Sequence, residues 1–168
     1  MTNDVDVIIA IDDSHVGRLT EAFGDGFYAD GDMMHDAIRN RSTFNVIHLS
    51  TMIKIDLFLP EETPFIQSEW ARRRLRKVRV DADRQPVYVA SPEDLVIQKL
   101  LWYRMTGERS DRQWADVQGI LKVQSLVLDY AYLAEWAVQM DLSDLLRRSL
   151  EDAGIATTTT STSSENPV

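Results

Sequence analysis

Near its start the chain has an uninterrupted run of apolar side chains at residues 7–11, followed directly by the polar triplet "DDS". A short continuous apolar run indicates a buried strand, and Asp and Ser side chains after it are typical of a helix N-terminus. Apolar residues then return at helical spacing, at Val16, Leu19 and Phe23. The pattern therefore predicts a strand and then a helix over residues 14–23.

A β-hairpin is expected further along the chain. Two runs rich in β-branched and apolar residues, at 43–49 and 52–59, are separated only by Ser50 and Thr51. The turn-rich segment "GDGFYADGD" and a short helix over residues 32–41 precede this hairpin.

A helix over residues 64–74 and two short strands are expected after the hairpin. The segment "LRKVRV" alternates apolar with basic side chains, which is typical of a half-exposed strand. The turn-forming segment "DADRQP" then leads to "VYVA", the expected partner strand.

The C-terminal part has the pattern of four helices. The first begins after Ser91, an N-cap residue that Asp94 follows three positions later, and it ends before Gly107. Three further helices are expected over residues 110–123, 129–139 and 141–153. Asp129 and Asp141 are the expected N-cap residues of the last two. Because strands come first and helices later, α+β is the expected fold class.

Composition narrows the class of protein. The 168 residues are 44% hydrophobic and 27% charged, as in an ordinary globular domain, with a formal net charge of −9. This charge opposes unspecific binding to nucleic acids or anionic membranes. The lack of cysteine excludes disulfides and thiolate metal sites, and the three histidines have no zinc spacing. No signal peptide or membrane span is visible, so a cytoplasmic protein is expected.

Asp4 and Asp6 stand at the start of the first strand, two residues apart. Side chains alternate along a strand, so both carboxylates are expected on one face with Cβ atoms about 6.6–7 Å apart. Carboxylates at this spacing can converge on two metal ions about 3.5–4 Å apart. Taken alone, the pair fits a solvated strand end better than a metal site.

Asp56 is a third carboxylate that changes this balance. It interrupts the apolar residues of "MIKIDLFLP" and shares a strand face with Lys54. An aspartate among apolar neighbours in mid-strand is costly unless it is paired or binds a cation. Metal ligation together with the first two aspartates is the favoured explanation. A salt bridge to Lys54 and a solvent-facing sheet surface stay open as alternatives.

These motifs, in this order, resemble the nucleotidyltransferase (polymerase β-like) fold. The similar segments are "DVD", "FNVIHLSTMIKIDLFLP", "ARRRLRKVRV" and "SPEDLVIQKLLWYRMTGERSDRQWADVQGIL". More closely, nearly all of residues 3–153 resembles small bacterial nucleotidyltransferase-like proteins related to type IV abortive-infection toxins. The resemblance implies a mixed β-sheet core with flanking helices over residues 1–90, incomplete at its N-terminus, and a helical region over 91–153. The low-complexity tail, 154–168, is expected to be disordered.

The resemblance also implies roles for single residues. The three aspartates match paired metal ligands and a third carboxylate, so that Asp56 is a ligand or a general base. Lys99 matches a lysine near the nucleotide phosphates, and Asp116 matches the aspartate of a later motif that belongs to the catalytic set. The alternatives are a solvated helix residue for Lys99 and a surface ion pair with Arg112 for Asp116.

The implied chemistry is the transfer of a nucleoside monophosphate from an NTP to a hydroxyl acceptor. Two Mg²⁺ ions are expected as cofactors, one at the acceptor oxygen and one at the triphosphate. RNA, protein and small-molecule acceptors all stay open.

One motif of the resembled family has no counterpart in this sequence. The family places a Gly-Ser pair at a helix start ahead of Asp-x-Asp, where it holds the triphosphate, and these 168 residues contain no Gly-Ser dipeptide. Impaired nucleotide binding is therefore expected. A truncated sequence, a misassigned start, completion by a second copy or a cognate protein partner, and a member that no longer catalyses all stay open. The alternative function is a non-catalytic nucleotidyltransferase-fold binding protein, for example one half of a toxin–antitoxin pair.

The basic run "RRRLRKVR" has two possible explanations. It concentrates positive charge on a chain that is negative overall. Such a patch can contact the phosphates of an RNA or nucleotide substrate. The favoured explanation is an edge strand that its charges keep soluble.

Overall fold

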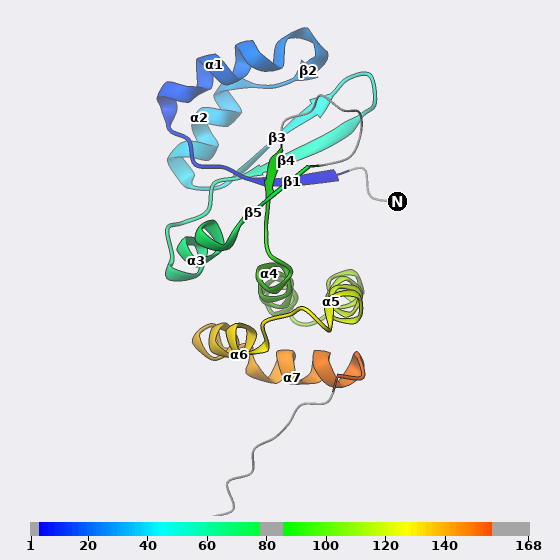
Figure 1. Ribbon diagram of the computed structural model, residues 1–168. Helices are drawn as coiled ribbons and strands as arrows, with labels where there is room; N and C mark the ends of the chain where they lie inside the picture. Colours follow the sequence, from blue (N-terminus) through cyan, green and yellow to red (C-terminus); the bar gives the residue numbers. More distant parts are fainter. Residues whose placement is uncertain (1–3, 78–85, 156–168) are drawn as a thin grey trace, which may run out of the picture. The chain divides into compact units, whose positions relative to one another are not determined.

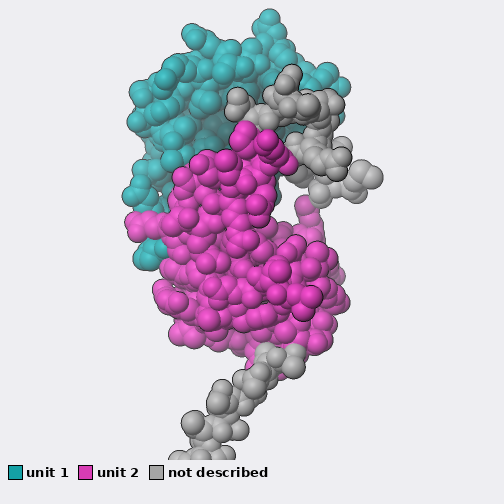
Figure 2. All heavy atoms as spheres, viewed as in Figure 1, with its two compact units in different colours: residues 1–66 teal, residues 67–168 magenta. Residues whose placement is uncertain are grey.

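The computed structural model describes residues 4–77 and 86–155 of the chain. It has the predicted α+β fold, with a mixed sheet, flanking helices and a helical C-terminal region (Figure 1). The chain divides into two compact units, residues 1–66 (unit 1) and residues 67–168 (unit 2), which Figure 2 shows in different colours. The sequence-based boundary at residue 90 stays a prediction.

Unit 1 is built around a four-stranded mixed sheet with the strand order β1-β4-β3-β2. β1 (Asp4–Ile8) runs parallel to β4 (Ile53–Phe58). β3 (Thr43–His48) runs antiparallel both to β4 and to β2 (Phe27–Tyr28). The hairpin expected from residues 43–59 is therefore confirmed as β3 and β4.

Two helices, α1 (Asp13–Phe23) and α2 (Gly31–Asn40), pack on one face of this sheet. Each begins at an aspartate that caps it, because the side chains of Asp12 and Asp30 accept hydrogen bonds from backbone N–H groups of the first turn. The apolar faces of the two helices and alternate residues of the strands form one core. Its buried members are Val16, Met34, Ala37, Phe44, Val46, Leu57 and Leu59.

Unit 2 contains a small antiparallel ribbon of β5 (Arg74–Arg76) and β6 (Val87–Val89). The division between the units falls within α3 (Pro64–Arg72), which precedes the ribbon. The four C-terminal helices are α4 (Pro92–Met105), α5 (Asp111–Gln124), α6 (Tyr130–Gln139) and α7 (Ser143–Asp152). α4 packs against α5 and α6, and α7 packs against the same two helices, so that the four helices form one packed group.

The helix ends test the capping predictions. Ser91 and Asp129 are N-cap residues, as expected, since their side chains accept hydrogen bonds from the backbone N–H groups of Asp94 and Tyr132. The expectation for Asp141 is wrong. Leu142 holds the N-cap position of α7, without a side-chain hydrogen bond, and Asp141 has a positive φ of 55°.

Two further points concern a short strand and the segments outside the described residues. The turn-rich segment before α2 contains the short strand β2, which its sequence did not indicate. Part of the strand expected in "LRKVRV", most of the turn "DADRQP" and nearly all of the tail lie outside the described residues. Among the helices of residues 4–77 and 86–155, none is long and apolar enough to cross a membrane.

Candidate functional site

The candidate site begins with a polar row on one face of the sheet in unit 1. Residues in register on neighbouring strands share a face, and the strands lie about 4.8 Å apart. Asp6 on β1 is in register with Asp56 on β4, which is in register with Asn45 on β3. Three side chains that carry oxygen atoms therefore stand in one row across three strands.

Asp4 occupies the strand position two residues before Asp6, in register with Lys54 of β4. The structure thus brings the strand positions of the three sequence-predicted metal ligands together on two adjacent strands. We call Asp4, Asp6 and Asp56 the acidic triplet.

Buried apolar side chains on the opposite face of the sheet fix this strand register. Phe44, Val46 and Leu57 alternate with the polar residues of β3 and β4 and are 2%, 0% and 6% exposed. A slip of one residue would turn these apolar side chains out of the core and the aspartates into it. Burial on one face therefore fixes the polar row on the other.

Asp56 is already paired within its own strand. The Lys54 ammonium lies 2.8 Å from Asp56 Oδ2, and the two side chains are 41% and 17% exposed. The salt bridge that was the alternative to metal ligation is therefore present. Among the side chains that the structure describes, no group of three or more His, Cys, Asp or Glu residues could hold a metal ion. Metal ligation by the acidic triplet stays a prediction.

The other two predicted site residues meet in unit 2. Lys99 on α4 places its ammonium 2.6 Å from Asp116 Oδ2 and 3.4 Å from Gln113 Oε1, both on α5. The Lys99 side chain is 20% exposed, so it is not a fully solvated helix residue. In the described residues the ion pair of Asp116 is thus with Lys99 and not with Arg112.

A buried polar cluster in unit 2 was not anticipated from the sequence. Asp94 is fully buried and accepts hydrogen bonds from the Ser91 hydroxyl at 2.6 Å and from the Tyr132 hydroxyl at 2.5 Å. The Tyr132 oxygen also lies 3.0 Å from the Ser68 hydroxyl. Burial and the bond to Asp94 raise the pKa of Tyr132, which keeps it protonated as a donor.

Two more carboxylates are buried beside this cluster. Burial and the charge of Asp94 raise the pKa of Glu69 to about 7, although Gln98 donates to both of its oxygens. Burial also disfavours the charged form of Glu93, but hydrogen bonds, first among them one from the Asp129 backbone N–H, and the Arg72 charge hold its pKa below its usual value. The sequence signal for this burial was weak, because only the cap at Ser91 pointed to it.

The basic run divides between inward and outward side chains. Arg72 turns inward, 3.2 Å from Glu93 Oε2 and with its guanidinium 3.8 Å from the centre of the Tyr132 ring. Arg73 is exposed and lies over the Tyr88 ring, at 4.6 Å. The basic patch is therefore smaller than the sequence indicates, and its last arginine lies outside the described residues.

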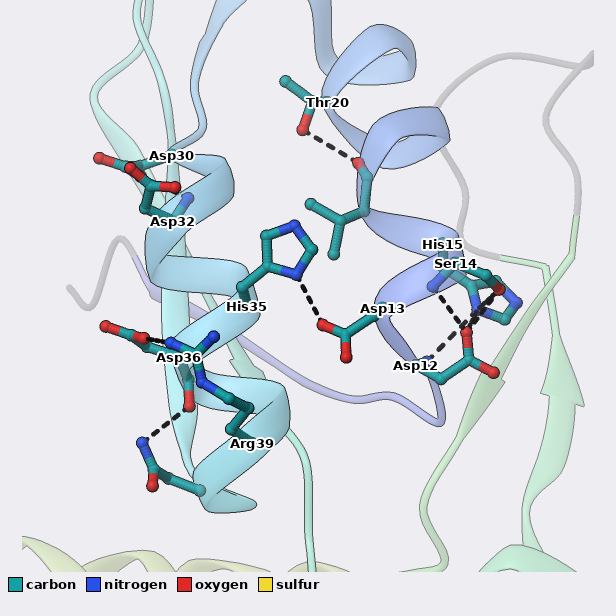
Figure 3. A network of polar contacts seen from close by, with 12 residues as sticks. Asp12, Asp13, Ser14, His15, Thr20, Asp30, Asp32, His35, Asp36 and Arg39 are labelled. Carbon is teal, nitrogen blue, oxygen red and sulfur yellow. Dashed lines mark hydrogen bonds and ion pairs between the residues drawn. The ribbon is translucent and has the colours of Figure 1, made fainter.

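The histidines have structural partners in unit 1. His35 on α2 points toward Asp13 on α1, with Nδ1 2.6 Å from a carboxylate oxygen (Figure 3). His15 forms part of the capping box with Asp12, 2.8 Å away. His48 lies 2.7 Å from the Thr51 hydroxyl, as expected of a hydrogen-bonded structural histidine. These contacts account for all three histidines without a bound ion.

Comparison with known proteins decides the family. The family model DUF6036, described as a nucleotidyltransferase of unknown function, matches residues 1–143. The chain belongs to this family. No curated protein and no solved structure matched the chain.

The DUF6036 match spans both groups of candidate residues. It includes the strands of the acidic triplet in unit 1 and the Lys99–Asp116 pair in unit 2. The nucleotidyltransferase part of the sequence-based resemblance is confirmed, and membership of such a family implies nucleotide binding. The closer likeness to abortive-infection toxins stays a prediction.

Proposed function

We propose that this DUF6036 protein transfers a nucleoside monophosphate from an NTP to a hydroxyl acceptor, at a site built on the acidic triplet. One observation carries the proposal. Asp6 and Asp56 are in register on adjacent parallel strands, with Asp4 two residues from Asp6, in a chain that belongs to a nucleotidyltransferase family. Carboxylates held on neighbouring strands are suited to bind cations that accompany a triphosphate.

The donor set of the acidic triplet fits magnesium. Mg²⁺ prefers carboxylate oxygens and is usually held by one or two carboxylates together with phosphate oxygens and water. Bound there, Mg²⁺ would neutralise the triphosphate and make the acceptor hydroxyl more acidic. Asp4 and Asp6 would hold the ion from β1. Asp56 would hold it from β4 or accept the proton of the acceptor hydroxyl.

Lys99 and Asp116 have a supporting part in this proposal. Lys99 would bind the phosphates of the nucleotide with its ammonium group, as a point charge. Its ammonium lies 2.6 Å from Asp116 Oδ2. Asp116 would thereby keep the Lys99 ammonium oriented.

The test compares wild type with Asp56→Asn. Isothermal titration with MgATP and MgCTP should give binding heats for wild type that shrink in the variant. Incorporation of a labelled nucleotide into cellular RNA or protein should be lost in the same variant. Asp25→Asn changes an exposed aspartate in the turn after α1 and is the matched control. Equally weak heats for wild type and Asp56→Asn would contradict the proposal.

A second candidate, a non-catalytic nucleotidyltransferase-fold protein that binds a cognate partner, is favoured by one contact. The Lys54–Asp56 ion pair satisfies the third carboxylate without any cation. If that ion pair were permanent, the site would bind a nucleotide poorly, and the fold would serve only to bind the cognate partner. Incorporation that disappears in Asp4→Asn and Asp6→Asn variants would rule this candidate out.

A further inference from the structure

Lys54 is the one basic residue among the paired positions of β1 and β4, the two strands that carry the acidic triplet. It is in register with Asp4 on β1 and shares its own strand face with Asp56, two residues away. Its ammonium lies 2.8 Å from Asp56 Oδ2. The described contacts therefore place a positive charge where the proposed site needs a divalent cation.

Electrostatics favours a cation beside these aspartates. Like charges directly opposite one another on neighbouring strands destabilise a sheet, and Asp6 stands opposite Asp56. The Asp56 side chain is only 17% exposed, so water screens it less than it screens an exposed carboxylate. Lys54 neutralises this carboxylate through their ion pair.

The same contact sets up a competition. An oxygen of Asp56 that accepts hydrogen bonds from an ammonium group is a poorer ligand for a second cation, because the two positive charges repel each other at short distance. Lys54 keeps 41% of its side chain exposed, which leaves room for the ammonium to move away.

We propose that Lys54 is a positioning residue that occupies Asp56 until a divalent cation binds, and that cation binding displaces its ammonium. This inference rests on the proposed function for the identity of the site. Lys54 holds the carboxylate in place and lowers the affinity of the site for metal. Cation binding also releases the Lys54 ammonium from Asp56.

The measurement is the affinity for Mn²⁺, followed by electron paramagnetic resonance at constant ionic strength. Lys54→Met should lower the Kd for Mn²⁺ about twofold to fivefold, because partly exposed ion pairs are of modest strength. Lys122→Met, at an exposed position of α5, is the matched control and should leave the Kd unchanged. In EDTA, Lys54→Met should melt at a lower temperature than wild type, and saturating Mn²⁺ should narrow that difference.

A double-mutant cycle separates displacement from a general effect of charge. In an Asp56→Asn background, Lys54→Met should give no gain in Mn²⁺ affinity, since the amide does not hold the ammonium as a carboxylate does. A gain of the same size in that background would mean a long-range field and would overturn the inference. A Kd that Lys54→Met leaves unchanged or raises would overturn it as well.

These outcomes are distinct from a failure of the proposed function. Tighter Mn²⁺ binding by Lys54→Met without any nucleotide incorporation by wild type would support the displacement and reject the activity. Nucleotide incorporation by wild type, combined with an unchanged Kd in Lys54→Met, would support the activity and reject the displacement. Absence of Mn²⁺ binding from wild type and all variants would reject both.

Discussion

Buried carboxylates in unit 2 show how strongly single residues depend on their partners. Asp94 is 0% exposed, and its carboxylate accepts hydrogen bonds from two hydroxyl groups, while its own backbone N–H donates to the Ser91 hydroxyl. Glu93 is 1% exposed and has Arg72 as its ion-pair partner. Glu69 is 5% exposed and receives its hydrogen bonds from the neutral amide of Gln98. Their responses to mutation and pH should therefore differ.

Tyr132→Phe should destabilise the protein by about 1–3 kcal/mol, because it leaves an oxygen of the buried Asp94 without its hydroxyl donor. Urea denaturation at pH 7 measures the change. Tyr28→Phe removes the same hydroxyl from a side chain that is 51% exposed, and this control should change the free energy of unfolding little. Equal effects of the two substitutions would show that the bond to Asp94 contributes nothing.

Glu69 should make stability fall as pH rises toward neutrality. Burial raises the pKa of Glu69 from 4.5 to about 7, so between these values the folded protein binds a proton that the unfolded chain has lost. The contribution of the protonated group is complete below about pH 4.5 and is lost as pH rises through about 7.

Glu69→Gln keeps a neutral acceptor for Gln98 at every pH. Relative to wild type, this variant should therefore gain about 1–3 kcal/mol in free energy of unfolding between pH 5 and pH 8. Urea denaturation at the two pH values measures it, with the exposed Glu21→Gln of α1 as the control. A difference between wild type and Glu69→Gln that does not change with pH would contradict the assignment.

At the scale of residues, the sequence predicted contacts best where one face of a strand is buried. The alternation in "MIKIDLFLP" placed Asp56 and Lys54 together on one face, and the structure pairs them. No local pattern pointed to Glu69 or to Tyr132 as a partner of Asp94, because these contacts join α3 and α6 to α4 across 29 and 38 residues of sequence. Such contacts depend on tertiary packing, which single-sequence periodicity does not contain.

At the scale of elements, helix ends explain both a success and a failure. Gly107 has a φ of 67° and its N–H donates to the Arg104 carbonyl, so it ends α4 as expected of glycine. Asp141 has the same role at the end of α6, where its N–H donates to the Val138 carbonyl. An aspartate in the left-handed conformation is uncommon, so the sequence favoured the more frequent N-cap role. The two-residue strand β2 was too short for any period to indicate it.

The two aspartates that were expected as caps should therefore respond differently. Asp129→Ala should lower the free energy of unfolding by about 1 kcal/mol, because the Tyr132 N–H loses its acceptor. Asp141→Gly should leave it unchanged or raise it by up to about 1 kcal/mol, because glycine adopts positive φ without strain. Thermal and urea unfolding of the pair measure the contrast. A larger loss for Asp141→Gly than for Asp129→Ala would contradict these roles.

At the scale of the whole chain, the candidate groups are shared between two compact units. The acidic triplet belongs to unit 1, and the Lys99–Asp116 pair belongs to unit 2. The strand and the helix that carry these groups could be predicted, because each has a local pattern, a strand alternation or a capped helix. The family match covers both groups.

If both groups contribute to the proposed function, substitutions should affect metal binding and nucleotide transfer separately. Lys99→Met should reduce nucleotide incorporation about 10²-fold or more, since it removes a charge proposed to stabilise the phosphates. It should leave the Kd for Mn²⁺ unchanged, because the ion is proposed to bind the acidic triplet in unit 1. Asp56→Asn should impair both. Incorporation and Mn²⁺ titration are measured on the same preparations, with Lys122→Met as the control for loss of a lysine. Should Lys99→Met retain full incorporation, Lys99 and Asp116 would be a structural ion pair between α4 and α5, and the transfer chemistry would belong to unit 1 alone.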